Sequence, residues 1–233
     1  MRVVLSAELE EFREEVRAWI RENAVPGLDR LGEPQHRAAQ YNLNYGAWTG
    51  APGEIAEAWD EWQRRNTEAG YMCPHWPTEV GGRAWDAVRL AVWNEELAAA
   101  NMARANRGLG EHLVGPAVIV HGTPEQKATI LPRVIAGTDM YAQGFSEPDA
   151  GSDLASLRTT GRVDGDSIVL NGQKIWTSLG HLANRMFMLC RTDPDVPKHR
   201  GLTYLIVDLD TPGIETRTTR NITGADDFTE EFL

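Results

Sequence analysis

Two short motifs hold most of the residues whose types and spacing could do chemistry. The first, Q-G-F-S-E-P-D-A-G-S-D, runs from Gln143 to Asp153, and the second, N-G-Q-K-I-W-T-S, runs from Asn171 to Ser178. The first combines the hydroxyls of Ser146 and Ser152 with glycines, such as Gly151, that let a ligand approach the backbone closely. Its Pro-Asp pair favours a turn, and consecutive N–H groups in such a turn suit a phosphate or an electron-rich ring edge. The motif therefore predicts a cofactor cradle, with a solvated loop as the alternative.

The second motif places a large indole directly before two hydroxyls, because Trp176 precedes Thr177 and Ser178. An indole face with nearby donors suits one wall of a site for a flat heteroaromatic cofactor. The structural alternatives are a tryptophan in the core and a strand-end serine that bonds its own backbone.

In this order and spacing, the two motifs resemble the flavin-binding signatures of the acyl-CoA dehydrogenase family, (Y/L)-x-x-T-E-P-x-A-G-S-D and K-x-W-(I/T)-(T/S). The resemblance runs from about residue 5 to the end of the chain. It includes W-P-T-E-V-G-G at 76–82, E-E-L at 95–97 and H-G-T-P-E-Q-K-A-T-I-L-P at 121–132. It implies an FAD site formed by Gln143, Phe145, Ser146, Gly151, Ser152, Trp176, Thr177 and Ser178.

Individual roles in that site also follow from the resemblance. Ser178 matches the hydroxyl that bonds the N5 and O4 edge of the flavin, and a donor there polarises the ring toward reduction. Ser152 matches a hydroxyl near the cofactor phosphates and the pantetheine arm of the substrate, so it is also a predicted substrate contact. Gln143 stands where Tyr or Leu is common, and Phe145 stands where Val is common. Backbone donors, more than side chains, are therefore expected at these two positions.

The activity that the resemblance implies is FAD-dependent α,β-dehydrogenation of an acyl-CoA thioester. A base removes a proton from Cα, Cβ delivers a hydride to flavin N5, and an electron-transfer flavoprotein takes the electrons. The implied assembly is a homo- or hetero-oligomer, a dimer of dimers. An acyl-CoA oxidase that gives its electrons to oxygen is the alternative within the fold. A non-catalytic, flavin-holding scaffold subunit is the alternative of another class, and fatty acyl and steroid side-chain thioesters both stay open as substrates.

No residue of this chain is assigned as the catalytic base. A carboxylate is needed for that step, but Glu147 is expected to tie the cradle backbone together. Glu95 and Glu96 are expected in the middle of a helix, on a solvated or scaffold face. In the family, the base generally comes from a C-terminal helical domain. The terminal F-T-E-E-F-L at 228–233 resembles F-x-E-V-F-F inside the middle β domain, so the chain is expected to be a fragment truncated before that C-terminal bundle.

The composition is that of a globular protein without general affinity for nucleic acid or anionic lipid. The 233 residues are 42% hydrophobic and 24% charged, with a net charge of −11. Two distant cysteines, Cys73 and Cys190, suggest buried thiols in a reducing compartment. The six histidines show no metal-ligand spacing, so no metal is predicted, and a structural role is favoured for His112. No secretory signal and no apolar run of about 20 residues is visible, which predicts a cytoplasmic protein without a membrane span.

Helical periodicity dominates residues 1–140, the predicted N-terminal domain. Ser6 is the predicted N-cap of a first helix, and further helices are expected at 55–69 and 85–100. Another is expected at 123–136, opened by a capping box at Thr123. Residues 113–120 are predicted to form a helix that is broken by a Gly-Pro pair. Residues 27–54 are predicted to form a long irregular segment, an excursion from the helices, in which the aromatic side chains of the segment pack together.

The periodicity changes to 2 after residue 151, so residues 141–233 are predicted to form a β domain, incomplete at its end. Strands are expected at 157–163, 167–170, 185–192, 203–209 and 214–218, with a D-G-D hairpin turn at 164–166. A helical domain followed by an antiparallel sheet is an α+β arrangement. The resemblance implies that the sheet is barrel-like.

Overall fold

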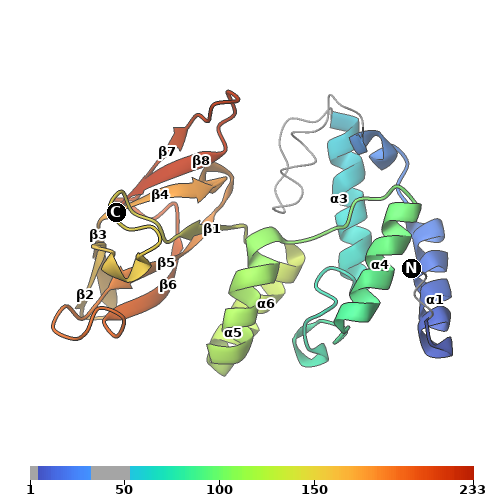
Figure 1. The fold of residues 1–233 in the computed structure, drawn as a ribbon, viewed down its shortest axis with the longest axis horizontal. Helices are drawn as coiled ribbons and strands as arrows, with labels where there is room; N and C mark the ends of the chain where they lie inside the picture. Colours follow the sequence, from blue (N-terminus) through green and yellow to red (C-terminus); the bar gives the residue numbers. More distant parts are fainter. Residues whose placement is uncertain (1–4, 33–52) are drawn as a thin grey trace. The chain divides into compact units, whose positions relative to one another are not determined.

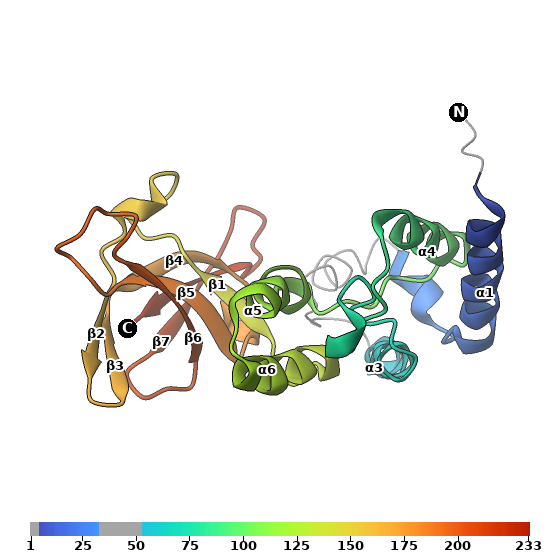
Figure 2. The same ribbon diagram turned by 90° about the horizontal axis from the view of Figure 1, so that it is seen from below.

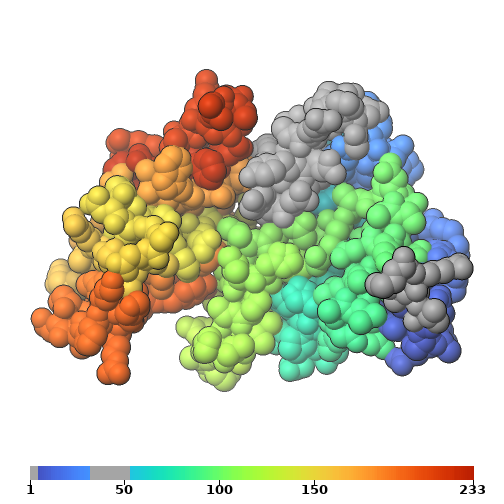
Figure 3. All heavy atoms as spheres, in the orientation of Figure 1, coloured from blue at the N-terminus to red at the C-terminus, as the bar shows by residue number. Residues whose placement is uncertain are grey.

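The computed structural model describes residues 5–32 and 53–233. The chain divides into two compact units, Met1–Thr138 and Asp139–Leu233. The boundary expected from the sequence lay two residues later, between residues 140 and 141. The first unit is helical and the second is built from strands (Figure 1), which confirms the α+β class. In Figure 3 the colours of the first unit run from blue to yellow-green, and those of the second from yellow to red. Residues 33–52, most of the predicted excursion, lie outside the described residues.

The helices of the first unit are α1 (Ala7–Asn23), α3 (Gly53–Glu68), α4 (Ala87–Ala99), α5 (Gly115–His121) and α6 (Pro124–Ala136). Helix α1 packs beside α4, and α5 packs beside α6 (Figure 2). The predicted caps are confirmed. Ser6 accepts the N–H of Leu9 at 3.3 Å, and Thr123 and Gln126 exchange capping-box hydrogen bonds at 2.9 and 3.2 Å. In the described residues, no helix combines the length and apolarity that a membrane span requires.

Aromatic rings form the centre of the helical unit. Trp19 of α1 contacts Trp62 of α3 at a centroid distance of 5.5 Å and Tyr71 at 4.7 Å. Tyr71 stacks on Trp93 of α4 at 4.9 Å. Large rings bury 150–250 Å² each, so this cluster joins three helices and the loop after α3.

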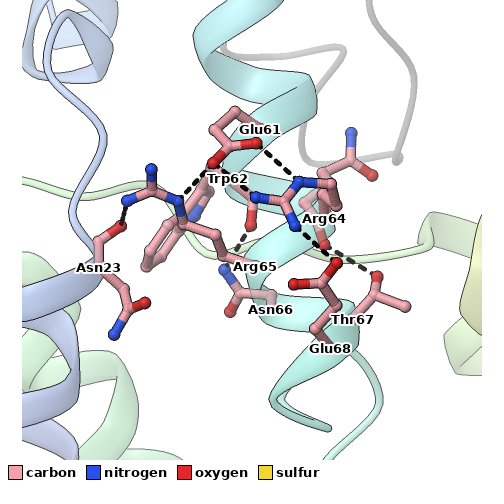
Figure 4. Close-up of polar contacts among 9 residues, drawn as sticks. Asn23, Glu61, Trp62, Arg64, Arg65, Asn66, Thr67 and Glu68 are labelled. Carbon is pink, nitrogen blue, oxygen red and sulfur yellow. Dashed lines mark hydrogen bonds and ion pairs between the residues drawn. The ribbon is translucent and has the colours of Figure 1, made fainter.

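Helix α3 also carries a group of paired charged side chains (Figure 4). The Glu61 carboxylate accepts hydrogen bonds from Arg64 at 2.8 Å and Arg65 at 2.7 Å. Arg65 also donates to the carbonyl oxygen of Asn23 at 3.0 Å, at the end of α1. The contact satisfies one of the carbonyls that a helix end leaves free, and it ties α3 to α1.

The helix predicted at 113–120 is not broken at its Gly-Pro pair. A π-helical segment, Gly110–Val114, leads directly into α5, where Pro116 lies in the first turn. Proline is tolerated there because the first-turn N–H groups have no partner within the helix. Gly115 is required by packing, since an added Cβ would overlap the Trp76 ring.

The strands of the second unit are β1 (Tyr141–Gly144), β2 (Thr160–Asp164), β3 (Ser167–Asn171), β4 (Gln173–Ser178), β5 (Arg185–Arg191), β6 (Leu202–Asp208), β7 (Glu215–Thr219) and β8 (Phe228–Phe232). One sheet has the order β1-β5-β2-β3 with β6 on β5, and the other has the order β4-β8-β7. In the described part of the chain the strands thus form two sheets and not one closed barrel. The sequence predicted an antiparallel sheet. The structure differs in part, because β1 and β5 pair in parallel.

The predicted hairpin is confirmed, because β2 and β3 pair in antiparallel register around Gly165, whose φ is +61°. The predicted strand start at residue 157 is wrong, since β2 begins at Thr160. The buried residues Met186, Met188 and Cys190 of β5 form the core of the larger sheet. Cys73 and Cys190 are both free and buried, as expected.

Candidate functional site

The cradle motif leaves the sheet at the end of β1 and turns back on itself. Gln143 and Gly144 lie in β1 beside Phe187 and Met188 of β5. Glu147 and Ala150 then exchange backbone hydrogen bonds of 2.9 and 3.1 Å, which closes the turn. The predicted turn is confirmed, and its anchor in a buried parallel strand explains why the loop holds its shape.

A buried ion pair joins the two motifs. The Lys174 ammonium of β4, which is fully buried, lies 2.8 Å from the Glu147 carboxylate and donates to the carbonyl oxygen of Phe145 at 3.2 Å. The same carboxylate accepts the N–H groups of Arg158 at 2.6 Å and Thr159 at 3.0 Å. Glu147 therefore ties the loop backbone together, as predicted, through three hydrogen bonds that use both of its carboxylate oxygens.

Stability of this loop is expected to fall in acid. Burial raises the pKa of Glu147, but the hydrogen bonds from Lys174, Thr159 and Arg158 outweigh it and hold the pKa below its usual range. A carboxyl with a lowered folded-state pKa stabilises the fold above its unfolded pKa, and this contribution is lost as the pH falls through the folded value. The protection factors of the amides at 145–159, which correct for the slower intrinsic exchange in acid, should therefore fall below about pH 4 in wild type. The fall should be smaller in Glu147→Gln, and an equal fall in both proteins would contradict this assignment.

The second motif forms a β-bulge. Strand β4 pairs with β8, but Lys174 faces Glu231 and Thr177 faces Thr229, so two residues of β4 oppose one residue of β8. Trp176 lies in this bulge with φ of +61° and its side chain is 59% exposed. Its indole meets the ring of Phe228 edge-on at 5.7 Å. A bulky residue at positive φ is rare, and here it directs a large ring toward solvent.

The two hydroxyls after Trp176 have different environments. Thr177 is fully buried and donates to the Glu231 carboxyl at 2.5 Å, so only its backbone is left to meet a cofactor. Ser178 is half-buried, and its hydroxyl makes no hydrogen bond within the described residues. Its side chain is therefore available to a ligand beside the indole.

The other predicted contacts lie on the cradle. The N–H of Ile175 donates to the carbonyl oxygen of Ser146 at 3.0 Å, which brings the two motifs side by side. Phe145 is half-buried and packs edge-on against Phe187 of β5 at 5.6 Å, so the larger ring at this position contacts the sheet. Gly151 and Ser152 are exposed.

The glycines of the cradle separate structural from ligand-facing positions. A Cβ at Gly144 would overlap the Met186 sulfur, so packing within the chain requires this glycine. A Cβ at Gly151 would meet nothing within 4 Å. The open space at Gly151, the exposed Trp176 ring and the available Ser178 hydroxyl fit a bound flat aromatic group with a phosphate tail.

A hollow of about 260 Å³ lies behind the turn, lined by Glu147, Pro148, Asp149, Arg158, Thr159, Gly172 and Gln173. It contains neither Trp176 nor Ser178. The cavity is therefore separate from the bulge surface where the indole and hydroxyl lie, and we assign it no part in the site.

The helical unit holds the acidic residues that were set aside as bases. Glu96 is 7% exposed and pairs with Arg17 at 2.8 Å and with Arg13 at 3.4 Å, which confirms its scaffold role between α1 and α4. Glu95 lies on the surface and pairs with Arg13 at 2.7 Å. Both carboxylates are occupied in packing the helices.

Sequence spacing did not show a cluster around the π-helical segment. His75, Glu111 and His112 bring potential ligand atoms within 4.8 Å of one another. Arg104, however, donates at 2.5 Å to the same Glu111 oxygen that faces His75 and His112. A metal ion would compete with this permanent positive charge, so the cluster is assigned no metal role. Burial lowers the pKa of both histidines, and two neutral rings stacked at 5.9 Å fit the structural role favoured for His112.

Two family models match the chain, and together they cover nearly all of it. The acyl-CoA dehydrogenase N-terminal domain matches residues 6–138, and the acyl-CoA dehydrogenase middle domain matches residues 142–232. Among curated relatives, acyl-CoA dehydrogenase IpdE1 of Mycobacterium tuberculosis is 42% identical over 229 residues. The alignment covers 97% of this chain and 56% of the relative, so the chain spans little more than half of that length.

Solved structures share the fold over the same part. The Tcur3481-Tcur3483 steroid ACAD aligns with a TM-score of 0.74 at 30% identity, covering 100% of this chain and 55% of that chain. The ChsE4-ChsE5 complex from Mycobacterium tuberculosis aligns at 0.72 and 31% identity, covering 100% and 54%. A glutaryl-CoA dehydrogenase from Mycobacterium smegmatis in complex with FADH2 aligns at 0.63 and 25% identity, covering 98% and 53%.

Proposed function

The chain belongs to the acyl-CoA dehydrogenase family, and we propose that it supplies the flavin cradle and part of the thioester site for α,β-dehydrogenation of an acyl-CoA. The bound FAD would accept the hydride that leaves Cβ of the substrate. The residues of this chain bind and orient. The base that removes the Cα proton is not among the residues that we assign here.

The β4 bulge is the observation that carries this proposal. It presents the exposed Trp176 indole next to the available hydroxyl of Ser178, and the Lys174–Glu147 pair fixes the cradle loop beside it. The indole offers one wall to a flat ring system. The Ser178 hydroxyl donates at the N5 and O4 edge, where negative charge develops on reduction. The open space at Gly151 and the exposed position of Ser152 leave them accessible to the phosphate and pantetheine groups.

The similar solved structures support one substrate class and one kind of assembly as the first to test. Because one structural neighbour is a steroid ACAD and another is a two-component complex, we propose a steroid-derived acyl-CoA as the first thioester to test. We also propose a hetero-oligomer in which the remainder of the protein or a partner chain supplies the base. An electron-transfer flavoprotein would then take the electrons.

Anaerobic mixing of the flavin-loaded protein with acyl-CoA thioesters tests the function. We expect a steroid side-chain thioester to bleach the flavin absorbance faster than a straight-chain one. If dioxygen alone supports turnover with release of peroxide, the oxidase alternative holds. If no thioester bleaches the flavin in the complete assembly, the chain is a scaffold subunit and the proposal fails.

Replacing Trp176 with alanine is expected to weaken FAD binding. Loss of one aromatic packing partner costs about 1–3 kcal/mol, which corresponds to a roughly 5- to 150-fold rise in the dissociation constant. Flavin absorbance titrations measure it, with Trp176→Phe as the matched variant that keeps an aromatic ring and should retain most of the affinity. Unchanged affinity and spectrum in Trp176→Ala would show that the indole does not touch the flavin.

A further inference from the structure

A carboxyl group is buried directly beneath the bulge. Glu231 of β8 is fully buried. Thr177 donates to its Oε2 at 2.5 Å, and the Thr229 hydroxyl is hydrogen-bonded to its Oε1. In the described part of the chain, no Lys, Arg or His forms an ion pair with it. An ionised carboxylate without a cation is unfavourable in such a site, so its protonation state needs an explanation.

A count of the protons on the Thr177 and Thr229 hydroxyls favours a protonated, neutral Glu231 carboxyl. The Thr229 hydroxyl contacts Glu231 Oε1 and also lies 3.2 Å from the carbonyl oxygen of Thr177, so its one proton faces two acceptors. If Glu231 carries a proton and donates it to Thr229, the Thr229 proton serves the Thr177 carbonyl. The Thr177 hydroxyl then serves Glu231 Oε2. Each of the three protons then has its own acceptor, and the hydrogen bonds form one closed ring.

This ring holds the backbone that carries the predicted flavin contacts. Thr177 and Ser178 stand between two residues in the left-handed region, Trp176 at φ +61° and Leu179 at φ +53°. Non-glycine residues persist there only when the surrounding structure fixes them. The ring fixes Thr177 through both its hydroxyl and its carbonyl oxygen. Gly180 covers it closely, since an added Cβ would overlap the Thr229 hydroxyl and lie 2.7 Å from Glu231 Oε1.

The charged groups around Glu231 do not compensate it. Its strand partner Lys174 directs its ammonium to the cradle carboxylate at 2.8 Å. On β7, Arg217 pairs with a glutamate of its own strand at 2.8 Å, and His181 before β5 is exposed. Burial first, and then the neighbouring charge of Glu230, raises the pKa of Glu231. Both effects favour the protonated carboxyl, which is the state that the hydrogen-bond pattern also favours.

We propose that Glu231 is a protonated positioning residue, which closes a hydrogen-bonded ring with Thr177 and Thr229 and thereby orients Trp176 and Ser178. The orientation toward the flavin rests on the proposed function, whereas the ring and its proton do not. A group that is neutral in the folded state and ionises more readily in the unfolded state stabilises the fold in acid. That contribution is lost as the pH rises through the raised pKa.

Infrared difference spectroscopy tests the proton directly in FAD-free protein. The wild-type minus Glu231→Gln spectrum at pH 7 should contain a carboxylic acid C=O band that shifts in D2O, and it should lack a carboxylate band. Glu230→Gln is the matched control on the same strand, and it should give no acid band. A carboxylate band at pH 7 would overturn the proposal, whether or not the protein binds FAD.

FAD binding tests the positioning role. Glu231→Val leaves the buried Thr177 hydroxyl without its acceptor and the Thr229 hydroxyl without its Glu231 partner, and it should raise the FAD dissociation constant about tenfold or more. Glu231→Gln keeps a neutral group with a donor and an acceptor, so it should stay within about threefold of wild type and keep the wild-type flavin spectrum. Equal weakening in the two variants, or none in Glu231→Val, would overturn the positioning role. Absence of FAD binding in wild type would instead refute the proposed function and leave the infrared result to decide the ring.

Discussion

Replacing Lys174 with methionine is expected to give the largest loss of stability of any single change in the two motifs. Methionine keeps the length of the buried stem but leaves the Glu147 carboxylate without its cation. Removal of one partner from a buried ion pair costs roughly 3–5 kcal/mol, and this is the expected loss in the free energy of unfolding. The cradle loop should open with it, since the same ammonium also holds the carbonyl oxygen of Phe145.

Lys198→Met is the matched control for this prediction. The Lys198 ammonium pairs with Asp153 at 2.7 Å, but both side chains are about half exposed. Such a surface pair contributes about 1 kcal/mol or less. Denaturant unfolding monitored at several pH values measures both variants. The loss in Lys174→Met should shrink in acid, where Glu147 takes up a proton, and a loss that equals the control at pH 7 would rule out a structural ion pair.

Ser178→Ala is expected to slow flavin reduction roughly ten- to a hundred-fold without abolishing turnover. One hydrogen bond at a site of developing charge is worth about 1.5–3 kcal/mol. Stopped-flow bleaching of the flavin by a saturating acyl-CoA measures the step. Folding should be unaffected, because the Ser178 hydroxyl has no partner in the described residues of the chain.

The control for Ser178 is Ser167→Ala, an exposed serine of β3 that lies in the other sheet. It should leave the rate of reduction unchanged. Complete loss of turnover in Ser178→Ala with FAD still bound would show that the hydroxyl takes part in proton transfer. An unchanged rate would place it away from the reacting edge of the flavin.

Local chemistry explains which elements could be predicted from the sequence. Ser6 and Thr123 cap helices through hydrogen bonds to residues three positions away, so the starts of α1 and α6 are visible in a short window. The D-G-D turn between β2 and β3 is equally local. The β1–β5 pair was missed because its partners lie about 44 residues apart, and short strands such as β1 carry little alternation.

The candidate site could be predicted only in part, because some of its partners are far apart in the sequence. The exposed indole and the cradle turn lie within single motifs, and the structure brings both motifs together. The Lys174–Glu147 bond spans 27 residues, and the Thr177–Glu231 bond spans 54. Neither pairing follows from spacing or composition. The buried state of Thr177 likewise depends on the bulge, which shifts the register by one residue and turns that side chain inward.

The 15N resonance of flavin N5 tests most directly the claim that the β4 bulge presents Ser178 to the cofactor. Protein loaded with FAD that is labelled at N5 and N3 is compared with the Ser178→Ala variant loaded in the same way. A hydrogen bond changes the shielding of the nitrogen that accepts it, so the N5 resonance should move between the two proteins while N3 stays in place. An N5 resonance that is identical in both would contradict the account, because the flavin edge would then lie elsewhere.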